Sequence, residues 1–308
     1  MRERSNISPL QAQVVCFGMI TAGVVLEVDR PPEHNTGQIV RHRAEFISDD
    51  AALVACALRQ WDIRTALIGT AVGDDAAGKW IGDQLEALGV IGGVRLSGNI
   101  TTPLEVNVSD PTGARTFFWQ RDLAVLDTLN TADLSPIKGS ELLYVDWYDG
   151  DRILRPMDEA ARLGIPIFLN LEHGHQDNDI LRRYASRATI CQAVVDEAQR
   201  GNDEEAVIAR LLEAGVQTAL VTLGDRGSLV ADRHGQVRLT PPNVRVVDGC
   251  AAGAIFSAGF IYGYLNGWPL KESARFATGA ASLNCTVVGP KVFPMEEVER
   301  VMAGPATR

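Results

Sequence analysis

Positive charge and long hydrophobic runs are both scarce in this sequence, and each shortage excludes a class of function. The 308 residues include 29 Lys and Arg against 39 Asp and Glu, a formal net charge of −10. Nucleic acids and anionic membranes bind clustered positive charge, so neither is an expected partner. The one dense basic run, 41–43, is best explained as a solvated strand face. No apolar run reaches the ~18 residues of a membrane span and no basic leader precedes an apolar stretch, so neither a transmembrane helix nor a secretory signal is expected.

Disulfide bonds are not expected either. The chain has only five cysteines, an odd number, and they are widely spaced. Most lie among apolar residues, which predicts buried free thiols in a reducing, cytoplasmic location. No metal-ligand spacing joins them to the five histidines. His173 and His175 could supply a two-ligand pair, although a loop rich in Gly and Asp explains them more simply.

Apolar residues are abundant, at 46% of the chain, which is enough for the core of one large domain. Short apolar runs that are typical of buried strands alternate with helical segments. This alternation predicts right-handed βαβ crossovers and a mostly parallel sheet whose ligand sites lie at the carboxyl ends of the strands. The expected strands are 14–18, 65–69, 142–145, 166–169, 189–191 and 218–222, and the expected helices are 50–61, 77–88, 152–163, 203–214, 255–265 and 270–285.

A second, smaller sheet is predicted from blocks that alternate polar and apolar residues, as strands do when one face meets solvent. The blocks are 38–43, 103–108 and 115–119, joined by a further strand at 23–28. Residues 117–119 are Phe-Phe-Trp, more aromatic surface than one face of a small sheet can bury. The excess indicates that these strands pair with another subunit.

The most informative stretch is 246–256, Val-Val-Asp-Gly-Cys-Ala-Ala-Gly-Ala-Ile-Phe. Its small residues allow several backbone N–H groups to converge on an anion at the N-terminus of the helix that follows. This pattern is typical of a phosphate-binding site. A second stretch, 222–227, ends a strand with two glycines three residues apart, which lets backbone approach a ligand; a plain turn before a hairpin at 228–238 also explains it.

These stretches together resemble the PfkB, or ribokinase-like, family of carbohydrate kinases. The stretch 222–227, followed by Pro-Pro at 241–242 and the motif at 246–254, resembles the nucleotide-binding half of the family. Further resemblance lies at 68–78, 113–117 and 289–298, and it extends from about 14 to 302. It implies one ribokinase-like α/β domain over 13–303, with a mostly parallel central sheet flanked by helices and a small β lid from about 23–48 and 103–121.

The resemblance also implies ATP and Mg²⁺ as cofactors, a small sugar-like ligand, and a homodimer formed through the lid strands. Backbone groups of Ala251, Ala252 and Gly253 would form the anion hole. The remaining implied positions are Thr222, Gly224, Gly227 and Thr278 for the nucleotide, Glu197 for the metal, and Gly23, Ser48, Asp49, Ala52, Asn170 and Glu172 for the substrate.

Several positions depart from the family pattern. The family's general base is an Asp, and its position here is Ala254. A methyl group cannot accept the proton of an attacking hydroxyl, a step to which a positioned carboxylate contributes ~10²–10⁴-fold. The sugar-binding Asp corresponds to Gly23, the Gly-Gly pair to the region of Ser48, and the Asn of an Asn-x-x-Glu motif to Val194. So many losses together favour natural divergence.

Two hypotheses follow. The chain is either an ATP-dependent carbohydrate kinase impaired by loss of its base, or a catalytically inactive homologue that binds a nucleotide or ligand in a regulatory role. A non-kinase enzyme using the remodelled site is a weaker third. Asp49 or Asp50 could enter the substrate cleft, although N-capping of the following helix also explains them. Glu172 is the candidate for a displaced acid, and Asp248 is expected to fix the phosphate-binding turn.

Overall fold

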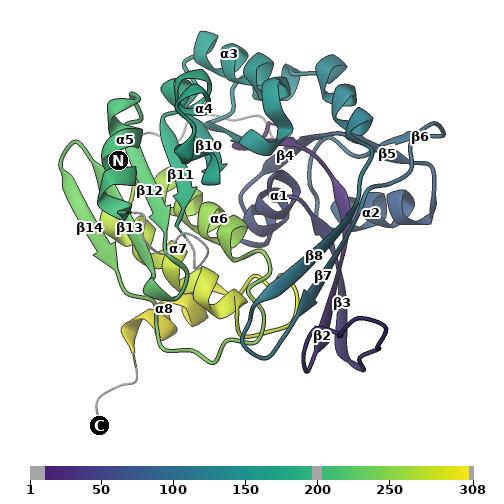
Figure 1. The fold of residues 1–308 in the computed structure, drawn as a ribbon. Helices are drawn as coiled ribbons and strands as arrows, with labels where there is room; N and C mark the ends of the chain where they lie inside the picture. Colours follow the sequence, from purple (N-terminus) through teal and green to yellow (C-terminus); the bar gives the residue numbers. More distant parts are fainter. Residues whose placement is uncertain (1–10, 196–202, 305–308) are drawn as a thin grey trace.

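The structure, a computed structural model, describes residues 11–195 and 203–304 and is built around an eight-stranded sheet (Figure 1). Strand order is β14-β13-β12-β11-β10-β9-β1-β4. The six strands from β12 to β4 are parallel, and β13 and β14 form an antiparallel hairpin at one edge. The bounds are β1 Val14–Gly18, β4 Thr65–Gly69, β9 Leu142–Asp146, β10 Ile167–Glu172, β11 Ile190–Val194, β12 Thr218–Thr222, β13 Ser228–Asp232 and β14 Gly235–Leu239. The predicted mostly parallel sheet is therefore confirmed.

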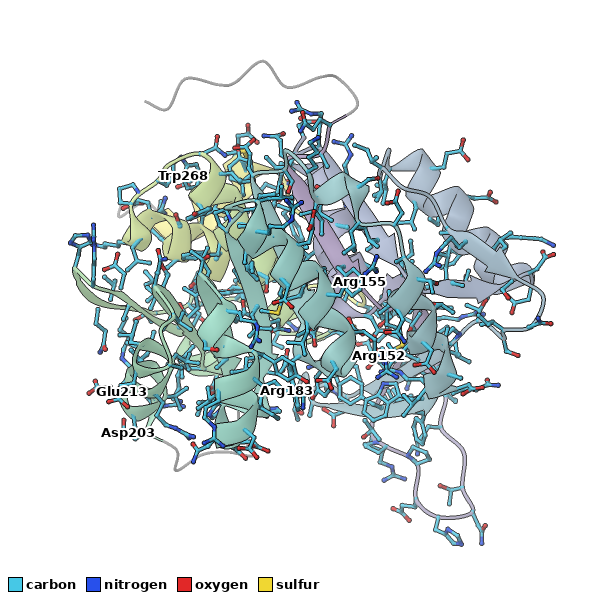
Figure 2. All side chains as sticks on the ribbon, turned by 90° about the horizontal axis from the view of Figure 1, so that it is seen from above. Arg152, Arg155, Arg183, Asp203, Glu213 and Trp268 are labelled. Atoms are coloured by element: carbon cyan, nitrogen blue, oxygen red, sulfur yellow. The ribbon has the colours of Figure 1, made fainter. Side chains whose placement is uncertain are left out.

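Helices cover both faces of this sheet, because its strands are apolar on both sides. In β1, Val14 and Cys16 pack into one hydrophobic core and Val15 and Phe17 into the other. The first core is closed by α1 (Asp50–Gln60), α6 (Ala252–Leu265), α7 (Leu270–Asn284) and α8 (Met295–Ala303), and the second by α3 (Leu154–Arg162), α4 (Asn178–Arg183) and α5 (Glu204–Glu213). In the view from above, Asp203 and Glu213 mark the two ends of α5 (Figure 2).

A four-stranded sheet in the order β3-β2-β7-β8 projects from the main body (Figure 1). Its strands are β2 (Thr21–Val28), β3 (Val40–Ser48), β7 (Leu104–Ser109) and β8 (Arg115–Gln120). The strand expected at 38–43 was placed too early. Only the exposed first half of β3 alternates in polarity; its end, Phe46 to Ser48, is buried and continues directly towards α1.

The remaining elements complete the connections. Helix α2 (Ala76–Ala87) lies beside the short pair β5 (Ala71–Gly73) and β6 (Arg95–Ser97). The sequence did not predict α4, α8 or the 3-10 segments Leu123–Thr131 and Trp147–Ile153. All five cysteines are free, as expected. Over the described ranges, no helix has the length and apolar character required to cross a membrane.

Candidate active site

The turn before α6 is held by two buried polar side chains. Asp248 accepts hydrogen bonds from the backbone N–H of Cys250 at 3.0 Å and of Gly289 at 2.9 Å. Asn284 donates from Nδ2 to the carbonyl oxygen of Cys250 at 2.6 Å. The predicted role of Asp248 in fixing this turn is confirmed. The backbone then passes through a left-handed conformation at Ala251, with φ 60°, and α6 begins at Ala252.

The first turn of α6 offers backbone donors but no acid of its own. The first N–H groups of a helix have no intrahelical acceptor, and the helix dipole adds partial positive charge there. The side chain of Ala254 is a methyl group in a residue that is 1% exposed. Ala252 N–H already donates to the Gly249 carbonyl oxygen at 3.3 Å, so the backbone donors for an anion would be those of Gly253 and Ala254. No proton can be accepted by the side chain at position 254.

Glu172 supplies a carboxylate beside this turn. It is the last residue of β10, where the pairing register with β11 shifts between Asn170 and Glu172 and the backbone of Glu172 takes φ 45° and ψ −123°. A bulge of this kind re-aims a side chain. A Cβ atom built on Gly253 would lie 3.8 Å from Glu172 Oε1. The expected displaced acid is thus adjacent to the first turn of α6.

Asn170 gathers three carboxylates around its amide group. Its Nδ2 lies 3.0 Å from Asp50 Oδ2, 2.8 Å from Asp146 Oδ2 and 3.1 Å from Glu172 Oε1. These residues come from α1 and the carboxyl ends of β9 and β10, the edge at which parallel strands place ligand sites. Burial, and then the neighbouring carboxylates, raise the pKa of Asp50 and of Asp146 well above the ordinary range.

The capping interpretation of Asp49 is wrong. Asp49 precedes α1 with φ 71°, and its side chain does not cap the helix. The carboxylate instead accepts hydrogen bonds from the Thr21 hydroxyl and from Arg121 at 3.0 Å. Arg121 also pairs with Glu105 at 3.3 Å, and Glu105 accepts from the Ser48 hydroxyl at 3.0 Å. Asp49 and Ser48 therefore belong to one polar network that joins the main body to the small sheet.

Two other expected substrate positions contribute no polar group. A Cβ on Gly23 would lie 2.7 Å from the ring of Phe46, so a side chain is excluded there unless Phe46 moves. Ala52 was expected at the substrate site, but it is 0% exposed and packs into the core on the buried face of α1.

The expected nucleotide positions lie at the end of β12 and in the helices beside it. Gly224 and Gly227 have φ of 59° and 87°, and a Cβ on Gly227 would lie 2.0 Å from the Leu239 carbonyl oxygen. The turn and the β13–β14 hairpin account for both glycines without a ligand. The Thr222 hydroxyl lies 3.4 Å from the Ala193 carbonyl, and the Thr278 hydroxyl pairs with Ser228 at 3.0 Å in the interior. Glu197 lies outside the described residues, just beyond Val194.

The acids that sequence reasoning missed are Asp146, Asp149 and Glu105. Asp146 could have been found, because it directly follows the apolar run of β9 and so stands at the carboxyl end of a strand. Glu105 lies inside an alternating strand, where an exposed face is the ordinary expectation. His173 and His175 follow β10 in a short 3-10 turn. Among the described residues, no group of three His, Cys, Asp or Glu is arranged to hold a metal ion.

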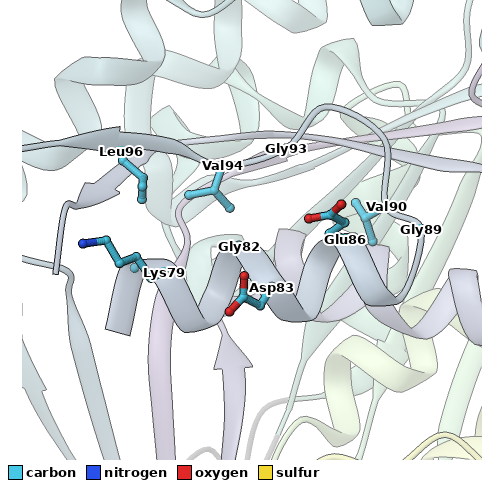
Figure 3. Close-up of a pocket in the computed structure, with 10 residues that line it drawn as sticks. Lys79, Gly82, Asp83, Glu86, Gly89, Val90, Gly93, Val94 and Leu96 are labelled. Atoms are coloured by element: carbon cyan, nitrogen blue, oxygen red, sulfur yellow. The ribbon is translucent and has the colours of Figure 1, made fainter. Parts of the chain in front are cut away.

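A surface cavity lies elsewhere, between α2 and the segment that leads to β6 (Figure 3). It has a volume of about 540 Å³ and is lined largely by glycine and aliphatic residues. Its only basic side chain, Lys79, is paired with Asp74 at 2.9 Å. Asp83 and Glu86 also line it, but all three charged residues lie on α2 alone, so this cavity is a weaker candidate than the acid-rich edge of the sheet.

Comparison with known proteins agrees with this geometry. The family model described as pfkB family carbohydrate kinase matches residues 11–297. A nucleoside kinase of Methanothermobacter thermautotrophicus is 27% identical over 277 residues, covering 87% of this chain and 88% of its own. The structure of a putative ribokinase from Agrobacterium tumefaciens superposes with a TM-score of 0.84 at 23% identity, covering 95% of this chain and 98% of the other. Arabidopsis thaliana ribokinase, solved with ribose and ATP, gives 0.74 at 21%, covering 95% and 99%.

Proposed function

Because the chain belongs to the pfkB family of carbohydrate kinases, we propose that it transfers the γ-phosphoryl group of ATP to a hydroxyl of a small polyhydroxylated molecule, with Glu172 as the base. The observation that carries this proposal is the position of Glu172 Oε1, 3.8 Å from where a Cβ on Gly253 would lie. The family's acid would stand one residue further along the same helical turn. Glu172 thus offers a carboxylate in the neighbourhood that Ala254 leaves without one.

The reaction uses the groups already described. The substrate hydroxyl passes its proton to Glu172 as its oxygen bonds to the γ-phosphorus and the bond to the leaving ADP oxygen breaks. Backbone N–H groups of Gly253 and Ala254 stabilise charge on the transferred group. Asn170 Nδ2, 3.1 Å from Glu172 Oε1, positions the base.

The residues present fit a phosphate group at the start of α6, because Gly253 has no side chain and the helix N-terminus favours an anion. Magnesium, when bound through the nucleotide phosphates, would neutralise charge on the phosphoryl group. Val194 lacks the polar atom of the family's Asn, so we expect weaker dependence of nucleotide affinity on magnesium than in a family member that keeps it.

An assay of ATP consumption against sugars, polyols and nucleosides tests the proposal, with product mass measured by spectrometry. We expect saturable phosphorylation of at least one compound. Glu172→Gln should then lower kcat by ~10²–10⁴-fold while nucleotide affinity is kept. Glu141→Gln, an exposed acid at the amino end of β9, is the matched control and should leave kcat unchanged. Full activity of Glu172→Gln would place the base elsewhere.

A second candidate is a nucleotide-binding protein without turnover, which the methyl group of Ala254 and the apolar Val194 favour. This candidate predicts saturable ATP or ADP binding by calorimetry with no phosphorylated product from any compound. Detection of one phosphorylated product excludes it.

A further inference from the structure

The acid-rich edge of the main sheet has more carboxylates than cations. Among the described residues, no Lys or Arg forms an ion pair with Asp50, Asp146 or Glu172, whose carboxylates all meet the amide of Asn170. Arg121 lies near this region, but its ion pairs are with Asp49 and Glu105. Asp146 is buried and Asp50 and Glu172 are partly buried. Carboxylates withdrawn from water are ordinarily paired, so this group favours positive charge from another source.

The amide hydrogens of Asn170 are also too few for its neighbours, although Asp146 accepts one further hydrogen bond, from the Tyr148 backbone N–H at 2.8 Å. Asn170 Nδ2 has two hydrogens and three carboxylate neighbours. Asn170 Oδ1 and Asp149 Oδ2 are buried acceptors without any partner, in residues that are 1% and 3% exposed. A buried acceptor without a donor is costly, and buried polar atoms in native proteins are nearly always satisfied. The unsatisfied amide oxygen belongs to the side chain that holds the three carboxylates together, so it points to a donor-rich ligand at this place.

We propose that the substrate carries a protonated amino group, as an amino sugar or amino polyol does. Asp50, Asp146 and Asn170 bind this amino group, while a hydroxyl group of the same substrate faces Glu172. An ammonium group provides three donors and no acceptor, which matches the deficit; a hydroxyl provides one donor and adds acceptor capacity. The buried Nε of Arg121, a donor without a partner, remains for a hydroxyl of the same molecule. The hydroxyl assignment rests on the proposed phosphotransfer, whereas binding of the amine does not.

Two other sources of positive charge fit less well. A metal ion needs several converging ligands, and within residues 11–195 and 203–304 no such group exists. Protons bind more readily here than to a free carboxylate when no ligand is present, since burial and the nearby acids raise the pKa of Asp50 and of Asp146. A bound ammonium would displace them. The titratable groups that interact with this pair are Asp49 before α1, Tyr144 of β9, Tyr148 and Asp149 after β9, and Glu172 of β10.

Isothermal titration calorimetry with pairs of compounds that differ only in the amine tests this inference. The pairs are glucosamine with glucose, galactosamine with galactose, and 1-amino-1-deoxysorbitol with sorbitol. At least one amine should bind at least about tenfold more tightly than its hydroxyl partner. Titration in two buffers of different ionisation enthalpy should show proton release for the amine and none for the neutral compound.

The variants Asp50→Asn and Asp146→Asn should each abolish the preference for the amine, with circular dichroism confirming the fold. Asp127→Asn, at an exposed acid paired with Arg152, is the control and should keep the preference. Equal or tighter binding of every neutral partner overturns the inference, as does an amine preference that survives in both variants. Amine preference without phosphorylation of any compound would support this inference and contradict the proposed kinase activity. Phosphorylation of neutral sugars without a preference for the amine would support the proposed kinase activity and contradict this inference.

Discussion

At the scale of single residues, Ala251 carries a local backbone cost. Its φ of 60° and ψ of 10° are left-handed, a conformation that costs an alanine roughly 1–2 kcal/mol. Glycine avoids this cost but gains about 0.4–1 kcal/mol of entropy in the unfolded chain. We therefore predict that Ala251→Gly raises the free energy of unfolding by about 0.5–1 kcal/mol, measured by urea denaturation.

The neighbouring residue provides the matched control for that change. Ala252 opens α6, so Ala252→Gly should lower the free energy of unfolding, by up to about 1 kcal/mol. A loss of stability in both variants would show that the backbone at residue 251 is not strained.

Individual site residues could be predicted from the sequence where the neighbouring residues in the chain determine their position. Asp248 stands inside a motif, and Glu172 follows an apolar strand, so both were identified before the structure. For Asp49 the sequence left substrate binding and helix capping open, because a helix cap and a ligand-site acid have the same local pattern. Its contacts with Thr21 and Arg121 join residues distant in sequence, and no local rule contains them.

At the scale of elements, the N-terminus of α6 is the predicted phosphate site. Gly253→Asp places a carboxylate beside the anion hole and close to Glu172 Oε1. Repulsion and crowding should lower the affinity for ADP at least about tenfold in calorimetry, with ADP chosen to avoid turnover.

Gly82→Asp on α2 is the control for that variant, because a Cβ there meets nothing within 4 Å. It makes the same chemical change on an exposed helix and should leave ADP affinity unchanged. Unaltered ADP binding in the Gly253→Asp protein would place the nucleotide elsewhere.

Most elements could be predicted because strands buried on both faces are short continuous apolar runs, whereas the helices are longer segments. The strands of the main sheet were found within a few residues. Helix α4 was missed because it spans only Asn178–Arg183 and has little apolar pattern of its own. Strand β3 was misplaced because its buried end, before α1, does not alternate.

At the scale of the whole molecule, the acid-rich edge makes stability depend on pH. Because the pKa of Asp146 is raised by burial, Asp149 and Glu172, the folded chain keeps a proton that the unfolded chain releases. Stability is therefore lost as pH rises above about 4, at roughly 1.4 kcal/mol per pH unit until the folded pKa is reached. Asp146→Asn removes this loss, so it should raise Tm by at least about 2–4 °C, and by more at pH 8 than at pH 5.

Thermal unfolding of both proteins across pH 5–8 measures this difference, with Asp127→Asn as the exposed control. A larger gain in Tm at pH 8 also supports a ligand-binding role, because it would show that Asp146 destabilises the protein when no ligand is bound. A gain in Tm that is equal at all pH values would mean that Asp146 is already ionised in the folded chain.

The small sheet gives the last prediction, a homodimer formed through its strands. Phe118 of β8 is 59% exposed. Successive side chains of a strand point to opposite faces, so Phe117 and Trp119 share the other face, where their rings stack 5.6 Å apart. Trp119 is 58% exposed as well, but its Nε1 donates to Glu105 at 2.8 Å, which links that face to the polar network, whereas Phe118 on the other face is left for a second copy. Light scattering at micromolar concentration should find a dimer for the unmodified protein. The Phe118→Ser variant should be a monomer. The Phe117→Ser variant, changed one residue away on the opposite face, should remain a dimer. A monomeric unmodified protein, or dissociation by Phe117→Ser alone, would contradict this arrangement.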